Sequence, residues 1–420
     1  MKIRNGVLVA LACLATPASA QLPQASAAAL GLGFNMTASA RGFAAVANNP
    51  AGLAMANSPG FSLAIPAVAV ESGLGPVTLA NLVDYENRVV PTSVKDAWLA
   101  DVTAAGGQSG SVGAGLTPVA FNVGSLGVQI SSQIGGEVSL GSDAVKLLLY
   151  GNAGRTGAAE DFDLQDSALD GYVVSTAAVA YGFRASPGLH LGVTGKFMVG
   201  TGLVVGRDDG TSLTSDPLGA DIRFPMLYPT APNDELNFNN GSGIGLDVGA
   251  IWVGPALTIG ATIQNLVSTF AWDLQGFSYT PGEAFFDIGD SDSNFDEFPA
   301  AGAPSVLLTA ADELTMKPVF SAGAEMTLSP VLRLSADIRK RVSGGLSFGP
   351  DFHMGVGAEL TALSFLPLRA HLAAVSGGAQ LGGGASVVLG PVNLSAAGAY
   401  RSDDFADAVL GMLTLSFGGN

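Results

Sequence analysis

The chain has 420 residues, and its hydrophobic content of 48% excludes intrinsic disorder. Charged residues make up only 13%, against ~25% in a typical soluble domain, so the highly charged surface of such a domain is excluded as well. With 35 Asp and Glu against 18 Lys and Arg, the net charge of −17 argues against a nucleic-acid partner, because phosphate binding needs a basic face.

Residues 1–20 have the features of a secretory signal peptide. Lys2 and Arg4 precede a short apolar run over residues 6–16, and Ala18-Ser19-Ala20 matches a cleavage site. The run is too short for the ~20 residues of a membrane-spanning helix. The single cysteine, Cys13, lies in this segment. We therefore expect residues 1–20 to be removed on export, leaving a chain without disulfides that depends on a large hydrogen-bonded architecture.

The rest of the chain shows apolar residues alternating with small or polar ones, which is typical of strands with two different faces. In the clearest case Ile244, Leu246 and Val248 share one face and Asp247 lies on the other. Gly254-Pro255 then turns the chain into a second alternating run. Each run has about ten residues, close to the ~9–11 that a tilted strand needs to cross a bilayer.

The same hairpin pattern recurs with very short turns. They lie at Gly124-Ser125, Ser186-Pro187-Gly188, Gly254-Pro255, Ser329-Pro330, a turn ending at Pro367, and Gly390-Pro391. These six hairpins supply twelve strands, and two unpaired runs at residues 61–69 and 409–417 bring the total to fourteen. The sequence therefore predicts an all-β fold, a 14-stranded antiparallel transmembrane β-barrel over residues 60–420, with both ends and the six short turns on the periplasmic side.

The other connections are long, at about residues 72–113, 136–170, 201–243 and 267–317. Short turns on one side and long loops on the other are typical of outer-membrane barrels. A soluble β-sandwich is the alternative, but it does not need strands matched to a bilayer. A Gly-rich solenoid would need a fixed repeat, and we find none. Within the first loop, residues 81–103 predict a short helix with Trp98 and Leu99 as its apolar contacts.

Charged and histidine side chains inside the strands all fall on the face opposite the apolar residues. They are His190, Lys196, Asp247, Glu325, Arg333, Asp337, His353, Glu359, Arg369 and His371. A charge facing lipid at mid-bilayer costs ~2–4 kcal/mol, so this placement fits a barrel with a polar lumen.

These lumenal groups have two interpretations. In the first, Lys196, Arg333 and Arg369 neutralise nearby carboxylates in a structural network with Glu325, Asp337 and Glu359. In the second, cations and histidines dock a carboxylate or another anionic head group. The candidate ligand residues are then Lys196, Arg333, Arg369, His190, His353 and His371. The histidines lack the spacing of a metal site, and we expect no cofactor.

Residues 21–59 lie between the signal peptide and the first strand, and they are too small and too rich in Gly and Ala to form a domain. They contain Asn49-Pro50-Ala51 after a stretch of small residues. This resembles the N-terminal hatch of the FadL/PorV-like outer-membrane barrels. Residues 145–152 look like a segment of an uncharacterised branch of the same barrels. The alternative for Asn49-Pro50 is an ordinary turn, since Asn before Pro favours turn initiation.

The resemblance implies that the hatch lies inside the lumen and that hydrophobic molecules pass through the barrel. Two features depart from the family pattern. The chain ends Phe417-Gly418-Gly419-Asn420, so the closing aromatic is not terminal. Aromatic residues make up only 7%, so interfacial girdles of such residues would be thin.

An acidic stretch near residue 290 has alternating oxygen donors at Asp290, Asp292, Asn294 and Asp296, a pattern that suits Ca²⁺. It is not an EF-hand, because Phe295 and Ala301 stand where that motif has Gly and Glu. A solvated acidic loop is the alternative.

The sequence predicts a protein of the outer membrane of a Gram-negative-type bacterium, in contact with its lipids, that passes hydrophobic or amphipathic, fatty-acid-like small molecules. The alternative is a PorV-like accessory barrel that binds a protein partner at its extracellular loops, in secretion or at the cell surface. A third hypothesis is a barrel with a purely structural or adhesive role at the cell surface. We do not expect an enzyme, because the only cysteine precedes the cleavage site, there is no P-loop, and the histidines are predicted to face the lumen.

Overall fold

The computed structural model describes residues 22–153, 155–230, 238–342, 344–346, 350–402 and 406–418. The predicted signal peptide lies outside these residues. Within them, no helix is long and apolar enough to span a membrane.

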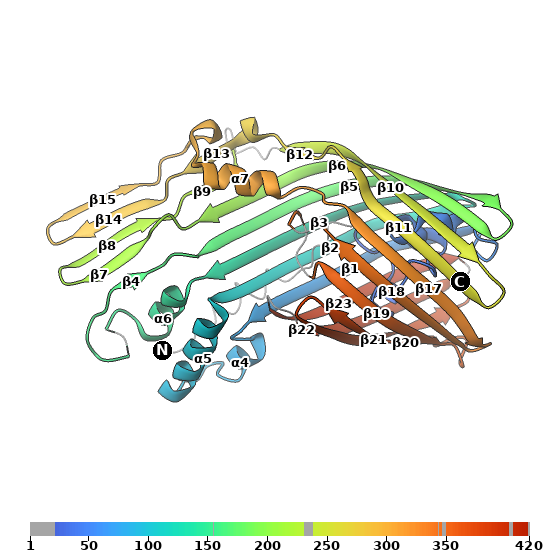
Figure 1. The fold of residues 1–420 in the computed structure, drawn as a ribbon, viewed down its shortest axis with the longest axis horizontal. Helices are drawn as coiled ribbons and strands as arrows, with labels where there is room; N and C mark the ends of the chain where they lie inside the picture. The colour runs from blue at the N-terminus through green and yellow to red at the C-terminus, as the bar shows by residue number, and fades with distance from the viewer. Residues whose placement is uncertain are drawn as a thin grey trace.

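Fourteen of the described strands form a closed antiparallel barrel (Figure 1), as the sequence predicted. Each strand pairs with the next along the chain, and β23 returns to pair with β1. The barrel strands are β1 (Phe61–Gly75), β2 (Gln108–Val123), β3 (Leu126–Leu140), β5 (Ala168–Ser186), β6 (Leu189–Arg207), β10 (Gly241–Val253), β11 (Leu257–Ser268), β17 (Val319–Ser329), β18 (Leu332–Arg341), β19 (Phe352–Leu360), β20 (Leu368–Val375), β21 (Gly378–Leu389), β22 (Val392–Ser402) and β23 (Asp407–Gly418).

The six predicted short connections join the expected strand pairs. Gly124, Gly188 and Gly390 have φ values of 57°, 81° and 61°, which a glycine adopts without steric cost in such tight turns. The strands run further than predicted at the opposite end, where β1 continues to Gly75 and β2 begins at Gln108. Backbone pairing continues there through Gly- and Ser-rich stretches in which apolar alternation is weak. The bounds of the first three predicted loops were therefore too wide, whereas the fourth, at residues 267–317, agrees with the observed 269–318 within two residues.

The wall of the barrel is uneven in height. β5 and β6 have 19 residues each, whereas β19 has 9 and β20 has 8. Side chains alternate as predicted: Ile244 is 59% exposed and Asp247 on the same strand is 2% exposed. The apolar residues thus form the outer surface of the wall, and the polar ones face inward.

The long connections carry four helices, α4 (Leu79–Val83), α5 (Thr92–Ala105), α6 (Ser142–Tyr150) and α7 (Ser305–Glu313). The predicted helix at residues 81–103 is divided into α4 and α5, and Trp98 and Leu99 of α5 are both buried. The short strands β9 (Met226–Pro229), β12 (Ala271–Trp272), β13 (Phe277–Thr280) and β16 (Phe298–Pro299) extend the barrel sheet.

A separate five-stranded sheet, here called the arm, lies at the end of the molecule away from the short turns (Figure 1). Its strands, in spatial order, are β15 (Asp290–Asn294), β14 (Glu283–Asp287), β8 (Leu218–Arg223), β7 (Ser212–Ser215) and β4 (Phe162–Asp163).

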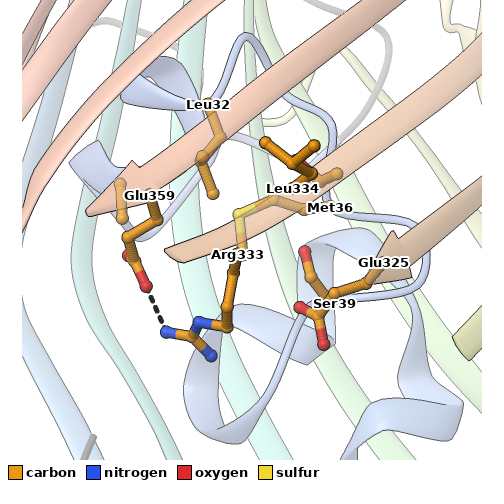
Figure 2. A pocket seen from close by; sticks show the side chains of 9 residues that line it. Leu32, Met36, Ser39, Glu325, Arg333, Leu334 and Glu359 are labelled. Carbon is orange, nitrogen blue, oxygen red and sulfur yellow. Dashed lines mark hydrogen bonds and ion pairs between the residues drawn. The ribbon is translucent and has the colours of Figure 1, made fainter. Parts of the chain in front are cut away.

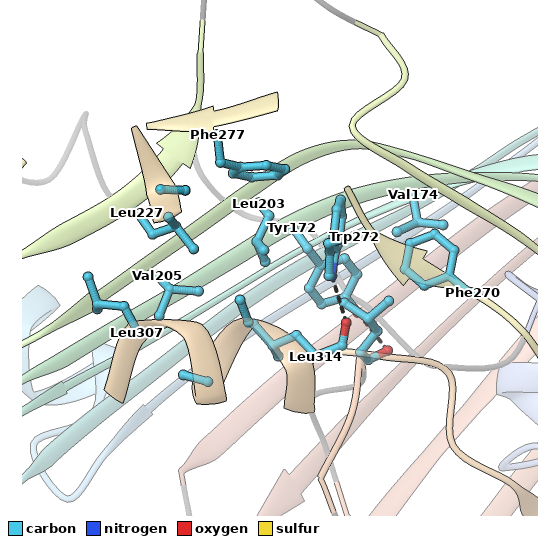
Figure 3. Packing of buried hydrophobic residues seen from close by; sticks show 14 of the residues in the cluster. Tyr172, Val174, Leu203, Val205, Leu227, Phe270, Trp272, Phe277, Leu307 and Leu314 are labelled. Carbon is cyan, nitrogen blue, oxygen red and sulfur yellow. Dashed lines mark hydrogen bonds between the residues drawn. The ribbon is translucent and has the colours of Figure 1, made fainter. Parts of the chain in front are cut away.

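An apolar layer covers the inner surface of the tall part of the wall (Figure 3). Tyr172 and Val174 share a face of β5 with Ala178 and Ala180, which contact the N-terminal residues inside the barrel. The connection between β11 and β17 folds back onto this face, and the indole N–H of Trp272 donates to the carbonyl of Leu314 at 2.8 Å. Aromatic and aliphatic side chains therefore line this end of the barrel.

Single cysteines test the orientation of the barrel. The chain has no cysteine after residue 20, so each introduced cysteine is unique. Asp292→Cys on the arm is expected to react with a membrane-impermeant maleimide in intact cells. Pro255→Cys, in the turn between β10 and β11, is expected to react only after the cells are opened. The reverse pattern would contradict the orientation.

Candidate functional site

Residues 22–58, here called the N-terminal segment, run inside the barrel as a chain of short helical turns. These are α2 (Ala27–Gly31), η1 (Gly42–Ala44), α3 (Ala45–Asn48) and η2 (Pro50–Ala54). The segment is mostly buried and consists largely of small residues, so its backbone approaches the wall closely.

Polar side chains from strands around the barrel hold this segment. Gln129 of β3 donates to the carbonyl of Pro23 at 2.7 Å, and Gln264 of β11 donates to the carbonyl of Ala47 at 2.7 Å. On another side, Thr414 of β23 accepts from a backbone N–H of the segment at 2.8 Å. These bonds satisfy backbone groups that would otherwise be buried without partners.

Asn49 joins three parts of the molecule through its side-chain amide. Its Nδ2 donates to the carbonyl of Thr37 at 2.7 Å and to the carbonyl of Ala250 on β10 at 3.2 Å. Its Oδ1 accepts from the backbone N–H of Ala51 at 3.1 Å and so caps η2, which begins with Pro50. Asn49 and Ala51 have no exposed surface. The tripeptide is therefore a turn, as the alternative interpretation had it, and that turn is bonded to the wall.

Three neighbouring glycines of the barrel wall, here called the glycine row, leave the space that this turn occupies. Gly182, Gly192 and Gly249 are direct cross-strand neighbours on β5, β6 and β10. A Cβ at Gly192 would lie 2.3 Å from the carbonyl carbon of Pro50, and one at Gly249 would lie 2.1 Å from Asn49 Oδ1. Any larger side chain would occupy the space of the turn. The sequence alone did not predict this role, although each glycine stands at an inward position of an alternating strand.

The lumenal ion pairs follow the predicted network only at Glu359. This carboxylate pairs with Arg333 and accepts from Arg369 Nε at 2.7 Å. Lys196 pairs with Asp247 at 2.6 Å and does not reach the predicted carboxylates.

The other two predicted carboxylates bind the N-terminal segment. Glu325 lies 3.6 Å from Arg41, and Asp337 accepts from the backbone N–H and hydroxyl of Thr37 at 2.9 and 2.7 Å. The lumenal charges thus anchor the segment as well as each other.

The three histidines are not brought together. His353 Nε2 lies 3.3 Å from Asn35 Oδ1, and His371 Nδ1 lies 3.2 Å from the carbonyl of Gly31. His190 is buried elsewhere on the wall. His190 is hydrogen-bonded to the backbone of Ala54, so all three histidines contact the N-terminal segment.

The acidic stretch near residue 290 also forms no cluster. Asp290 and Asp292 lie on β15, an extended strand paired with β14. Across the described residues, no group of three or more His, Cys, Asp or Glu side chains is arranged to hold a metal. The calcium prediction gains no support from this geometry.

A small pocket lies between the N-terminal segment and strands β17, β18 and β19 (Figure 2). It measures about 90 Å³. Its lining is mainly apolar on the side of the segment, where Ser39 is the one polar lining residue within the described part of the chain, and mainly polar on the side of the wall. The lining residues are Ala28, Leu32, Met36, Ser39, Glu325, Arg333, Leu334, Ser335 and Glu359.

Two polar groups of the pocket stand out. The side chain of Arg333 is 49% exposed although it pairs with Glu359. Ser335 Oγ is buried and has no hydrogen-bond partner among the residues that the structure describes. Glu325 also lines the pocket, but it pairs with Arg41. Since Arg333 and Arg369 share the other carboxylate, Glu359, they leave one positive charge in excess. The pocket therefore combines an apolar surface with an accessible guanidinium.

A sequence profile of a family of unknown function, DUF5723, matches residues 54–266, just over half of the chain. The chain belongs to this family. The matched part of the chain begins after Asn49-Pro50-Ala51 and ends within β11. No curated protein matches the chain in sequence.

Solved structures share the fold of this DUF5723 chain. The crystal structure of the P. putida toluene transporter TodX is 10% identical, with a TM-score of 0.56, over 96% of this chain and 100% of that one. A TodX deltaS2S3 mutant, described as a monoaromatic hydrocarbon channel, is 11% identical with a TM-score of 0.57, over 94% and 99%. A Pseudomonas aeruginosa FadL homologue is 11% identical with a TM-score of 0.48, over 95% and 99%. The fold is thus shared with the TodX structures.

The glycine row generates a prediction for Gly192. Gly192→Ala is expected to displace the Pro50 turn and to expose Arg41, the one trypsin site in residues 22–58. Cleavage after Arg41 in the purified protein should then be much faster. Gly195→Ala is the matched control, because no atom lies within 4 Å of a Cβ at that position of the same strand. Equal cleavage of the two variants would contradict the role of the row.

Proposed function

We propose that this barrel passes hydrophobic or amphipathic small molecules across the outer membrane and that residues 21–59 act as its hatch. The observation that carries the proposal is the N-terminal segment inside the barrel, seated on the glycine row, with the amphipathic pocket beside it. A simple aqueous pore needs an open polar lumen, and this filled lumen argues against one. The proposal assigns no enzymatic activity to the chain.

The two ends of the lumen suit molecules with an apolar body. The apolar layer around Trp272 and Leu307 lines the end near the arm. The pocket at Arg333 lies near the short turns, since Arg333 is the second residue of β18. Its volume of about 90 Å³ is below the ~300 Å³ of typical ligand pockets, so a larger molecule requires movement of the segment. TodX, a toluene transporter of the same fold, supports this proposal.

Among the predicted ligand residues, we propose Arg333 as the group that docks an anionic head, with Arg369 beside it. Both guanidiniums bond Glu359, and Arg333 retains exposed surface for a carboxylate. Lys196, His190, His353 and His371 lie outside the pocket lining. For these four we propose structural roles in the wall and the hatch.

Removal of the hatch tests the central proposal. Deletion of residues 22–58 is expected to leave a heat-stable barrel that conducts ions in planar bilayers while uptake of toluene by cells falls. Asn49→Ala should lower stability by ~3 kcal/mol, at ~1 kcal/mol for each of its three hydrogen bonds, and give intermittent conductance. Ala56→Ser, at an exposed position of the same segment, is the control. A deletion variant that conducts no better than the intact protein would refute the hatch.

Substitution of Arg333 tests the docking of anions. Arg333→Gln is expected to weaken binding of hexanoate to the purified protein by about tenfold, because the accessible positive charge is lost, while toluene uptake is unchanged. Arg369 still bonds Glu359 in this variant, so the fold should persist. Arg184→Gln, near the same mouth but outside the pocket, should bind hexanoate normally. Equal loss in both variants would rule out a specific site.

A further inference from the structure

The arm is a single-layered sheet with one apolar and one acidic face. The register places Phe162, Leu213, Ala220, Phe286 and Ser291 in one row across its five strands. Because side chains two residues apart share a face, Leu218, Ile222 and Ala284 belong to the same side. We call this side the apolar face.

The opposite side carries most of the charge of the arm. The neighbouring row contains Asp163, Asp221 and Asp292, with Phe285 between the last two. Glu283, Asp287 and Asp290 lie on the same side, and Arg223 is bonded to Asp221. This acidic face therefore has six carboxylates and one guanidinium.

The apolar face is covered at one end only. At β4, Phe162 is 2% exposed and lies under the ammonium of Lys146, 5.5 Å from its ring centroid. Towards β14 and β8, Phe286 is 50% exposed and Leu218 is 47% exposed. Antiparallel sheets usually pack one face on a core, and no described part of the chain supplies that core here. A contiguous apolar surface of this kind is typical of a binding site.

The negative charge of the arm determines which kind of partner can bind the apolar face. Asp290 and Asp292 lie on the edge strand β15, and Asp287 lies on β14, one strand spacing of ~4.8 Å further in. Since the Debye length is ~8 Å at physiological ionic strength, these carboxylates act on a partner that reaches that edge. An anionic membrane surface is repelled. A second copy of the chain, with the same net charge of −17, is repelled as well. A basic surface is attracted.

We propose that the arm binds a polypeptide partner whose contact surface is an apolar patch bordered by Lys and Arg. The apolar patch covers Phe286, Ile222 and Leu218, while the basic border faces Asp287 and Asp292 at the sheet edge. This function is separate from the passage of small molecules, because none of these residues lines the lumen.

Two labelled peptides test the surface. One is an amphipathic peptide of Leu and Lys, and the other has the same pattern with Glu in place of Lys. We expect the purified full-length protein in lipid nanodiscs to bind the Lys peptide at least about tenfold more tightly, as measured by fluorescence anisotropy. The double variant Ile222→Ser, Phe286→Ser should lose about tenfold in affinity.

Control variants distinguish binding at the apolar face from non-specific binding of the peptide elsewhere on the protein. Leu148→Ser removes an equally exposed leucine on α6, outside the arm, and should bind like the parent. Asp287→Asn with Asp292→Asn should weaken binding and flatten its salt dependence. Equal binding of the two peptides, or binding insensitive to the Ile222 and Phe286 substitutions, would overturn the proposal.

A photo-crosslinking residue in place of Phe286 tests the native occupant in intact cells. The expected adduct is one basic polypeptide, whose purified form binds the parent protein and loses this binding with Ile222→Ser, Phe286→Ser. Adducts with lipopolysaccharide only, with a second copy only, or with nothing would overturn the proposal. Toluene uptake should be normal in the arm variants, so failure of the arm and failure of the transport proposal give different results.

Discussion

The hydrogen bonds between β1 and β23 close the barrel, and every other feature of the molecule depends on that closure. In the hydrocarbon core an unpaired backbone group costs several kcal/mol, so a sheet that spans the membrane must have no free edge. The pairing of Leu63 with Phe417 and Leu74 with Asp407 removes both edges. Closure then fixes which side chains face inward, and with them the surface on which the N-terminal segment is held.

The N-terminal segment is held against the barrel wall both by close steric fit and by hydrogen bonds. The glycine row provides the space, and Asn49, Gln264 and Asp337 provide the bonds. Neither would suffice alone, because a close backbone contact without partners buries unsatisfied amides and carbonyls. The proposed hatch can therefore move only by exchanging these bonds for others. A molecule with a carboxylate and an apolar body could replace the polar contacts of the segment next to Arg333 and its apolar contacts next to Met36.

The sequence predicted the strands, the short turns and the inward charges because each follows from a local period of two. It did not predict the pairing of Lys196 with Asp247, which depends on the register between β6 and β10 across a long loop. The apolar layer was also missed, since Tyr172, Val173 and Val174 follow one another and carry no alternation. The arm was not predicted as a sheet, and its acidic stretch was interpreted as a calcium-binding or solvated loop. Its two faces become distinct only when five short segments from three loops are paired.

The unequal height of the wall has a consequence for the surrounding lipid. At ~3.3 Å per residue and a tilt of ~40°, the eight residues of β20 span about 20 Å, less than the ~25 Å apolar band of such barrels. On the opposite side β5 and β6 exceed that band. Acyl chains next to β19 and β20 must shorten to match, at a fraction of a kcal/mol for each Å of mismatch. We therefore expect the lipid around the barrel to be thinner beside β19 and β20 than beside β5 and β6.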